Sequence, residues 1–328
     1  MRILITGANG FLGRATMKAL REIKDATLVA AVRNRGQLNG IEAYADEIVE
    51  LDLADTTKLH KIVPDAEIIV HLAAAKFGSP ATMFANTVNP TELMFRILEQ
   101  NRTNLRRFIQ ISSLSVYALP TIPKGTMVNE NSQLEENWQV RDPYTKAKLW
   151  QEKVVREQCE RLDINYTILR PGSIYGEGAP LLSNRVGLQL PGIPIFLRIG
   201  SSAFLPLTHV DSCAQAIKLV VEKDQTEQSI FNIIDDDMPT QGEFLKLYQT
   251  HFGRVKRKIY VPYNFFRLCG HGFSLLHRIS KGNFPDIFSP YKIDAVWKPL
   301  LYSNSKLKSE LGWEPVMGLE AAFEALKK

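Results

Sequence analysis

Tyr144 and Lys148 lie four residues apart in the segment PYTKAK. On a helix this spacing places both side chains on one face, where the ammonium group can approach the phenol. A free tyrosine has a pKa of about 10, and a nearby cation favours the phenolate, which makes the side chain a general acid or base. Tyrosine and lysine at this spacing are also common on surface helices, so the pair needs support from its surroundings.

A serine-rich stretch, QISSLSVYA, supplies that support. It ends an apolar run that is predicted to be a strand, which places Ser112, Ser113 and Ser115 at the carboxyl edge of the expected sheet. Ligands bind at this edge in open α/β sheets. The pattern therefore indicates a site for proton transfer rather than a solvated helix face.

The chain opens with an apolar run followed by TGANGFLG, in which glycines recur every three residues. Gly7 follows the first predicted strand, and Gly10 lets the backbone approach a ligand closely. Gly13 allows the helix that begins near Phe11 to pack on that strand. Such a loop directs backbone N–H groups and the positive end of a helix dipole at a pyrophosphate. Its place between a strand and a helix predicts dinucleotide binding.

The end of the second predicted strand bears on which dinucleotide binds, because a carboxylate there would accept from the ribose hydroxyls of NAD. The sequence at that point is AAVRNR, in which Arg33, with Arg35 nearby, offers guanidinium groups suited to a 2′-phosphate. These arginines favour NADP(H) as the cofactor, with NAD(H) as the alternative. They could also be part of a solvated basic loop that binds no cofactor. Asp52 follows the third strand, where its carboxylate either accepts from the adenine amino group or caps the next helix.

The elements that must position these residues alternate between two periods. Predicted strands are RILITG, TLVAAV, EIVEL, EIIVHLA, RFIQISS and NYTILRP, and the helical stretches between them include GRATMKALREIK and NPTELMFRILEQNR. This alternation predicts an α/β fold, a Rossmann-type doubly wound parallel sheet with helices on both faces. We expect a dinucleotide-binding domain over residues 1–175. A smaller, mostly helical substrate-binding region is expected over 176–328, interleaved with late strands and helices of the first domain.

The amino-acid composition limits the classes to which this protein can belong. A chain of 328 residues with 45% hydrophobic content can bury a substantial core. The 40 basic and 35 acidic residues are mixed along the chain, so nucleic-acid binding is not implied. Cys159, Cys213 and Cys269 are far apart, which indicates reduced thiols and no metal site. We expect a cytoplasmic protein, because neither a signal peptide nor an apolar stretch of about 20 residues is visible.

Several segments together resemble the extended short-chain dehydrogenases/reductases of the NAD-dependent epimerase/dehydratase family: TGANGFLG, LDLAD, HLAAA, SSLSVY, YTKAK, LRPGSIYG, LTHVD and LKSELGWEP. The resemblance implies that Tyr144 donates or accepts the proton, while Lys148 holds the nicotinamide ribose and tunes Tyr144. It also implies that Ser113 hydrogen-bonds the reacting oxygen, with Ser112 as the fallback. Asn86 falls where the family places an asparagine on the central helix.

The resemblance extends to the cofactor contacts. HLAAA is expected beside the pyrophosphate and ribose, and RPGSIYG against the nicotinamide amide. The cofactor-binding residues that we predict are Gly7, Asn9, Gly10, Phe11, Leu12, Gly13, Arg33, Asp52, Leu53, Leu72, Ala73, Ala74, Lys148, Pro171 and Ser173.

Departures from the family pattern bear on the substrate. Nucleotide-sugar members commonly carry an arginine just before the HV-D segment and another in an R-x-G-D stretch, and both serve the diphosphate. Here Leu205 stands at the first place and the second motif is missing. The tail instead resembles the 3β-hydroxysteroid dehydrogenase-like branch. We therefore expect an apolar pocket between Ser113, Tyr144, Leu205 and the segment 263–279.

Segment 263–279 has helical periodicity, with Arg267, His271, Ser274 and Arg278 at intervals of four, three and four residues. Three interpretations stay open: a helix packed on its own domain, a lid over an apolar substrate, and a weak anchor at a membrane surface helped by the upstream RVKRK.

Three functions follow. The main expectation is an NAD(P)-dependent oxidoreductase that interconverts a ketone and a secondary alcohol on a fairly apolar small-molecule substrate. The first alternative is a nucleotide-sugar epimerase, dehydratase or reductase. The second is a non-catalytic NADP-binding module. The resemblance also allows a homodimer formed through helices that include YTKAK.

Overall fold

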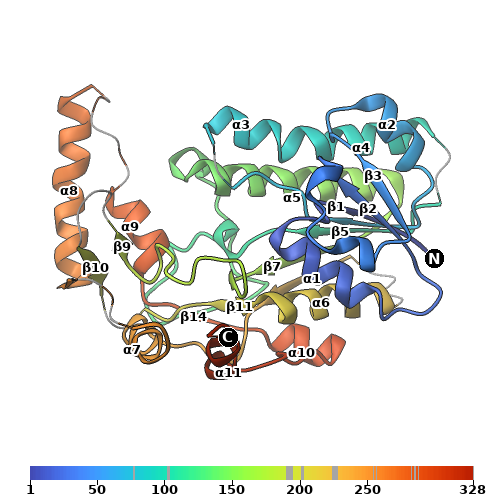
Figure 1. Ribbon diagram of the computed structural model, residues 1–328. Helices are drawn as coiled ribbons and strands as arrows, with labels where there is room; N and C mark the ends of the chain where they lie inside the picture. Colours follow the sequence, from blue (N-terminus) through green and yellow to red (C-terminus); the bar gives the residue numbers. More distant parts are fainter. Residues whose placement is uncertain are drawn as a thin grey trace.

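The structure is a computed structural model that describes residues 1–76, 78–101, 104–189, 195–200, 203–223, 228–253, 255, 257–281, 283, 286 and 288–327. Seven parallel strands form its central sheet in the order β12-β7-β5-β4-β1-β2-β3 (Figure 1). Six of them are the predicted runs, and β12 joins the edge from late in the chain. The strands are β1 (Arg2–Thr6), β2 (Thr27–Val32), β3 (Glu47–Glu50), β4 (Ile68–His71), β5 (Arg107–Ile111), β7 (Asn165–Pro171) and β12 (Ser229–Ile233).

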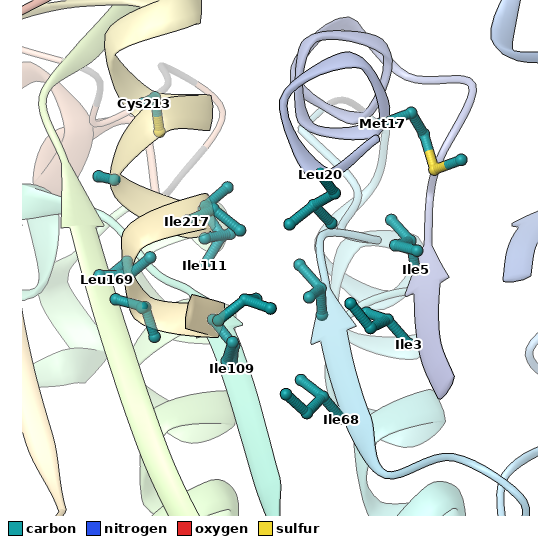
Figure 2. Close-up of a cluster of buried hydrophobic side chains, with 14 of the residues drawn as sticks. Ile3, Ile5, Met17, Leu20, Ile68, Ile109, Ile111, Leu169, Cys213 and Ile217 are labelled. Carbon is teal, nitrogen blue, oxygen red and sulfur yellow. The ribbon is translucent and has the colours of Figure 1, made fainter. Parts of the chain in front are cut away.

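Helices α1 (Phe11–Leu20) and α6 (Val210–Glu222) cover one face of this sheet. Figure 2 shows Met17 of α1 and Ile217 of α6 directed toward the strands, and both are buried. Alternate residues of a strand point to opposite faces, so the core on this side takes every second strand residue. These residues include Ile3 and Ile5 of β1, Ile68 of β4, Ile109 and Ile111 of β5 and Leu169 of β7.

The other face is covered by α2 (Thr56–Ile62), α4 (Val88–Gln100) and α5 (Pro143–Leu162), and α3 (Pro80–Ala85) packs on α4 and α5 (Figure 1). Phe95 of α4 and Val155 of α5 belong to the buried cluster here. The intervening strand residues join this cluster, among them Leu4, Ile69, Phe108 and Ile168. Two cores of this kind fix α1 and α5, the two helices that carry the predicted chemistry.

A topological switch lies between β1 and β4. The chain runs outward from β1 to β2 and β3, then returns to β4 on the opposite side of β1. Thr6 and His71 are paired at the carboxyl ends of these two neighbours. The connections that leave the two strands diverge, which opens the crevice where doubly wound sheets bind ligands.

Small sheets and further helices make up the remainder of the described chain. The sheet orders are β13-β10-β9, β11-β8 and β14-β6. Their strands are β6 (Met127–Val128), β8 (Ser173–Tyr175), β9 (Leu188–Gln189), β10 (Phe196–Ile199), β11 (Leu207–His209), β13 (Lys258–Val261) and β14 (Leu301–Tyr302). The helices are α7 (Gln241–Phe252), α8 (Tyr263–Ile279), α9 (Pro290–Trp297), α10 (Ser305–Leu311) and α11 (Leu319–Ala325). The 3₁₀ turns are η1 (Arg35–Gln37), η2 (Ile41–Ala43), η3 (Leu114–Val116) and η4 (Trp138–Val140).

The predicted helix over 263–279 is α8, and its bounds match the prediction. It packs on α9 and stands at the end of the molecule opposite the β3 edge of the sheet (Figure 1). Among the described residues, no helix combines the length and the apolar character needed to cross a bilayer.

Candidate active site

The glycine-rich loop after β1 has the geometry that the sequence predicts. Gly7 adopts φ +70°, a left-handed conformation that favours glycine. A Cβ added to Gly13 would lie 2.2 Å from the carbonyl oxygen of Gly7, so helix α1 can approach the loop only without a side chain there. Helix α1 has neither a side-chain N-cap nor an acidic residue in its first turn. The backbone N–H groups at its start are therefore suited to an anion such as a pyrophosphate.

Two adjoining cavities lie along the carboxyl edge of the sheet. The larger, of about 780 Å³, brings together the glycine-rich loop and the predicted catalytic set, Ser113, Tyr144 and Lys148. Of the other predicted cofactor residues it is lined by Gly7, Gly10, Phe11, Leu12, Gly13, Leu72, Ala74, Pro171 and Ser173. Sequence reasoning did not select Ser183 and Asn184, which also line this cavity. These two residues leave no signal in the Pro- and Gly-punctuated segment in which they occur.

The second cavity, of about 680 Å³, takes in the remaining predicted cofactor residues. It is lined by Gly7, Asn9, Arg33, Asp52, Leu53, Ala73 and Ala74, together with Asn86. Gly7, Ala74 and Lys76 line both cavities, so the two form one elongated site. This shape fits a dinucleotide whose pyrophosphate lies at the glycine-rich loop.

Tyr144 lies near the start of α5, whose first turn is fixed by its cap. The Asp142 side chain accepts from the backbone N–H of Thr145, and Pro143 occupies the first turn. Burial raises the pKa of Tyr144 to about 12, although a hydrogen bond with Ser113 opposes the rise. Tyr144 therefore carries its proton at neutral pH and is set to donate it.

In this structure Lys148 does not bring the pKa of Tyr144 below its ordinary value, because burial of the phenol dominates. The Lys148 ammonium group is buried and donates to the Ile111 carbonyl oxygen at 2.6 Å and to Oε1 of Gln151 at 3.0 Å. Burial and the positive charge of Lys76 lower the pKa of Lys148 to about 7. Desolvation of the phenolate therefore dominates at Tyr144.

A buried polar chain connects Lys148 to the end of β1. The Gln151 side-chain amide donates to Oγ1 of Thr91 at 2.9 Å, and Nε2 of His71 lies 3.0 Å from the same oxygen. Nδ1 of His71 lies 2.7 Å from Oγ1 of Thr6, the residue before Gly7. Burial and the charge of Lys148 lower the pKa of His71 to about 3, so the imidazole is neutral.

Lys76 is a site residue that sequence reasoning missed. Its side chain is open to both cavities, yet the surrounding protein lowers the pKa of its ammonium group by desolvation. The available signal was its place two residues after Ala74 in HLAAAK, next to the segment expected beside the pyrophosphate. A cation there can pair with a phosphate group.

Arg33 and Arg35 have different surroundings. Arg33 lines the second cavity, whereas the Arg35 guanidinium group donates to the Ile48 carbonyl oxygen and holds its own turn in place. Asp52 also lines this cavity and accepts from the backbone N–H of Ala54 at 3.0 Å. The alternative role of Asp52 as a helix cap is wrong, because the N-cap of α2 is Asp55.

Among the described residues, neither of the two cavities is the apolar pocket that the sequence predicts. Leu205 is 2% exposed in a core cluster around α7 and α11, held where its backbone N–H donates to the Pro239 carbonyl oxygen. Helix α8 lines neither cavity, because its buried side is occupied by α9. Several polar side chains line the larger cavity instead, including Ser112, Ser113, Ser173, Ser183, Asn184 and Lys76.

Comparison with known proteins identifies the family. The model of the NAD dependent epimerase/dehydratase family matches residues 3–233. The chain belongs to this family. The glycine-rich loop, the uncapped α1 and the adjoining cavities suit the dinucleotide for which the family is named.

Similar proteins span the chain nearly end to end. UDP-glucose 4-epimerase of Vibrio cholerae is 23% identical over 331 residues, which cover 98% of this chain and 93% of the relative. The crystal structure of UDP-glucuronic acid 4-epimerase from Bacillus cereus in complex with NAD has a TM-score of 0.74 at 19% identity and covers 100% and 97% of the two chains. The structure of the UDP-Glc/GlcNAc 4-epimerase from Campylobacter jejuni has a TM-score of 0.74 at 18% identity, and the match covers 99% of this chain and 98% of that chain. These likenesses show the Rossmann-type fold. The three relatives do not support the expected 3β-hydroxysteroid dehydrogenase-like branch.

Within the epimerase/dehydratase fold, a buried ion pair holds α5 against the sheet. Glu152 accepts from Nε and Nη2 of Arg170 at 2.9 and 2.6 Å, and both side chains are buried. Arg170 lies on β7, one residue before Pro171 of the larger cavity. A bidentate contact of this kind fixes the register of α5, and with it Tyr144 and Lys148, relative to the sheet edge.

Proposed function

We propose that this protein is a nucleotide-sugar epimerase. With a nicotinamide cofactor, it would invert the configuration at a carbon of the substrate that carries a secondary hydroxyl group. The observation that carries the proposal is the cavity that joins Ser113, Tyr144 and Lys148 to the glycine-rich loop. The relatives that span the chain have names that describe UDP-sugar 4-epimerases, which supports this function over the oxidation or reduction of an apolar ketone or alcohol.

The bound nicotinamide would supply a hydride acceptor and donor. Gly10, Gly13 and the start of α1 would hold its pyrophosphate with backbone N–H groups. Lys76 would add a cation beside the phosphates. Pro171 and Ser173 would lie against the nicotinamide.

Tyr144 would accept the proton of the reacting hydroxyl group in one half-reaction and return a proton in the other. Ser113, which is hydrogen-bonded to Tyr144, would orient the reacting oxygen. In the half-reaction that needs a base, Tyr144 would have to lose its proton against the effect of burial, and positive charge beside the phenol, from Lys148 and from an oxidised nicotinamide, would favour that loss. In the return half-reaction, the protonated Tyr144 would donate.

Polar side chains among the lining of the larger cavity support a hydroxylated substrate. Ser183 and Asn184 offer hydrogen-bonding groups to this cavity, and an apolar molecule would leave them unpaired. The division into a cofactor-binding region over 1–175 and a substrate-binding region over 176–328 is part of this proposal, since these two residues belong to the second region.

We propose NADP(H) as the preferred cofactor because Arg33 lines the cavity expected to hold the adenosine. NAD(H) is the alternative, since the Bacillus cereus structure was solved with NAD. Arg35 contributes little to the preference because its guanidinium group is engaged with Ile48.

Product analysis tests the proposal. The protein is incubated with NAD⁺ or NADP⁺ and, separately, with UDP-glucose, UDP-N-acetylglucosamine and UDP-glucuronic acid, and the sugars are separated by chromatography. We expect the 4-epimer of at least one substrate. Tyr144→Phe should lower its formation by roughly 10² to 10⁴-fold, as for a positioned acid–base group. Tyr248→Phe, which removes a hydroxyl outside both cavities, should leave the rate unchanged. An equally active Tyr144→Phe would contradict the assignment.

A further inference from the structure

Helix α8 presents an apolar face to solvent. The four most exposed large hydrophobic side chains among the described residues all lie on it, at 56% to 70% exposure: Phe265, Leu268, Leu275 and Ile279. Leu276 adds to the same face at 50%. Their spacing of three, seven and four residues keeps them on one side of the helix.

The opposite side of α8 explains why this face is free. Phe266 packs against Phe288 and Trp297, with ring centroids 5.7 and 5.8 Å apart. A Cβ on Gly270 would lie 2.8 Å from Cδ1 of Ile293, so glycine permits the close contact with α9. The helix is thus anchored on one side, and its exposed apolar face is not needed for that packing.

A cationic flank borders the exposed apolar face. Arg267, His271 and Arg278 lie along one side of α8, and Lys281 follows its end. Arg267 is paired with Asp294 of α9 at 3.0 Å, whereas Arg278 and Lys281 are exposed to solvent. Helix α8 itself contains no acidic residue.

The surrounding sequence strengthens this charge bias. Residues 244–285 contain eight lysines and arginines and no aspartate or glutamate. They include the basic RVKRK segment, of which Arg254 and Lys256 lie outside the described residues. The carboxylates of Asp294 and Asp286 pair with Arg267 and Lys292, respectively.

We propose that α8 docks on an anionic lipid bilayer, with its apolar face inserted at the headgroup boundary and its cations against the lipid phosphates. An amphipathic helix with an apolar face and basic residues beside it binds membranes in this way. Charge decides between this partner and a second copy of the chain. Two copies joined through α8 would bring two acid-free basic segments together, whereas an anionic surface neutralises them.

Vesicle flotation of the full-length protein tests the proposal. One vesicle preparation contains phosphatidylcholine and phosphatidylglycerol, and the other contains phosphatidylcholine alone. We expect the protein to float with the anionic vesicles, to float less with the neutral ones, and to be released as salt is raised. A protein that stays with neither preparation overturns the proposal.

Variants separate the apolar from the electrostatic contribution. Leu268→Gln, Leu275→Gln and Ile279→Gln combined should lower binding by about tenfold or more. Arg278→Glu with Lys281→Glu should weaken binding to the anionic vesicles. Met127→Gln with Val316→Gln changes large exposed hydrophobic side chains elsewhere and should leave binding intact.

Two further measurements control for loss of folding and for dimer formation. Thermal unfolding checks that each variant is folded, and Ile279→Gln alone, at the most exposed position, should lower binding in the same direction. Light scattering after gel filtration distinguishes the second-copy interpretation. The membrane proposal would be overturned if the protein forms dimers without vesicles, the triple variant is monomeric, and neither protein binds lipid.

Discussion

The Nζ atom of Lys148 lies 3.0 Å from Oε1 of Gln151, almost one turn further along α5. The amide of Gln151 is itself fixed by bonds to the Thr87 carbonyl oxygen at 3.2 Å and to Oγ1 of Thr91 at 2.9 Å. Because Gln151 is fully buried and held at both ends, it fixes where the ammonium group can lie. We infer that Gln151 is a positioning residue for Lys148.

Gln151→Met keeps the volume but removes the acceptor, and we expect kcat to fall roughly tenfold or more with little change in KM. The loss of one hydrogen bond to a charged group costs about 1.5 to 3 kcal/mol. Gln151→Glu keeps an acceptor and adds a negative charge, so it should raise the pKa of Lys148 and shift the pH profile of kcat upward. Equal rates and profiles for all three proteins would exclude the positioning role.

The pKa of Lys148 predicts how stability changes with pH. Its folded-state pKa of about 7 lies below the ordinary value of 10.5, so between these values the unfolded chain binds more protons. The penalty for burying the charged lysine is complete below pH 7 and is relieved as pH rises toward 10.5, so this residue makes stability increase with pH. Urea unfolding across this range should show a steeper rise for the natural protein than for Lys148→Met. Parallel curves would contradict the buried cation.

Arg33→Asp tests cofactor choice. If Arg33 contacts a 2′-phosphate, the substitution should weaken NADPH binding more than about tenfold while NADH binding stays similar or improves, because a charge-assisted contact is lost. Arg35→Asp is the matched control. Its guanidinium group is engaged with Ile48, so any loss should be equal for the two cofactors. Equal losses for Arg33→Asp would mean that Arg33 is only structural.

Gly13→Ala tests the closeness of α1 to the loop. The added Cβ would lie 2.2 Å from the Gly7 carbonyl oxygen, so the variant should lose about 1 to 3 kcal/mol of stability and most of its cofactor affinity. Gly272→Ala places a Cβ in open space on a helix and should be tolerated. Thermal unfolding and cofactor titration measure both effects. Similar behaviour of the two variants would contradict the close contact.

Much of this fold can be predicted from the sequence because local pattern and tertiary role coincide. The β-branched run ending at Thr6 and the glycines after it fix both a strand and a loop, so the loop and the start of α1 at Phe11 were predictable. The i, i+4 pair Tyr144 and Lys148 requires only that α5 be a helix. Every predicted catalytic and cofactor-binding residue lines one of the two cavities, since the carboxyl edge of a parallel sheet gathers them.

The predictions that the structure does not support concern properties set by contacts between segments far apart in the sequence. Leu205 is an apolar residue in a family position expected near the substrate, but the packing of α7 and α11 buries it. The pKa of Tyr144 follows from enclosure by several elements, which no spacing reveals. Gln151, by contrast, leaves a signal that was available, because its i+3 spacing from Lys148 places an amide beside the ammonium group.

The central claim is that the cofactor is returned unchanged after each inversion of a sugar hydroxyl, and a turnover count tests it most directly. The protein is given UDP-sugar in large excess over NAD⁺ or NADP⁺, while reduced nicotinamide is followed by absorbance and the epimer by chromatography. We predict epimer far in excess of the cofactor supplied, with no net accumulation of reduced nicotinamide. Reduced nicotinamide formed in step with an oxidised product would contradict the account, as would net NADPH consumption with a simple ketone and no epimer from any sugar. Either result would favour an oxidoreductase.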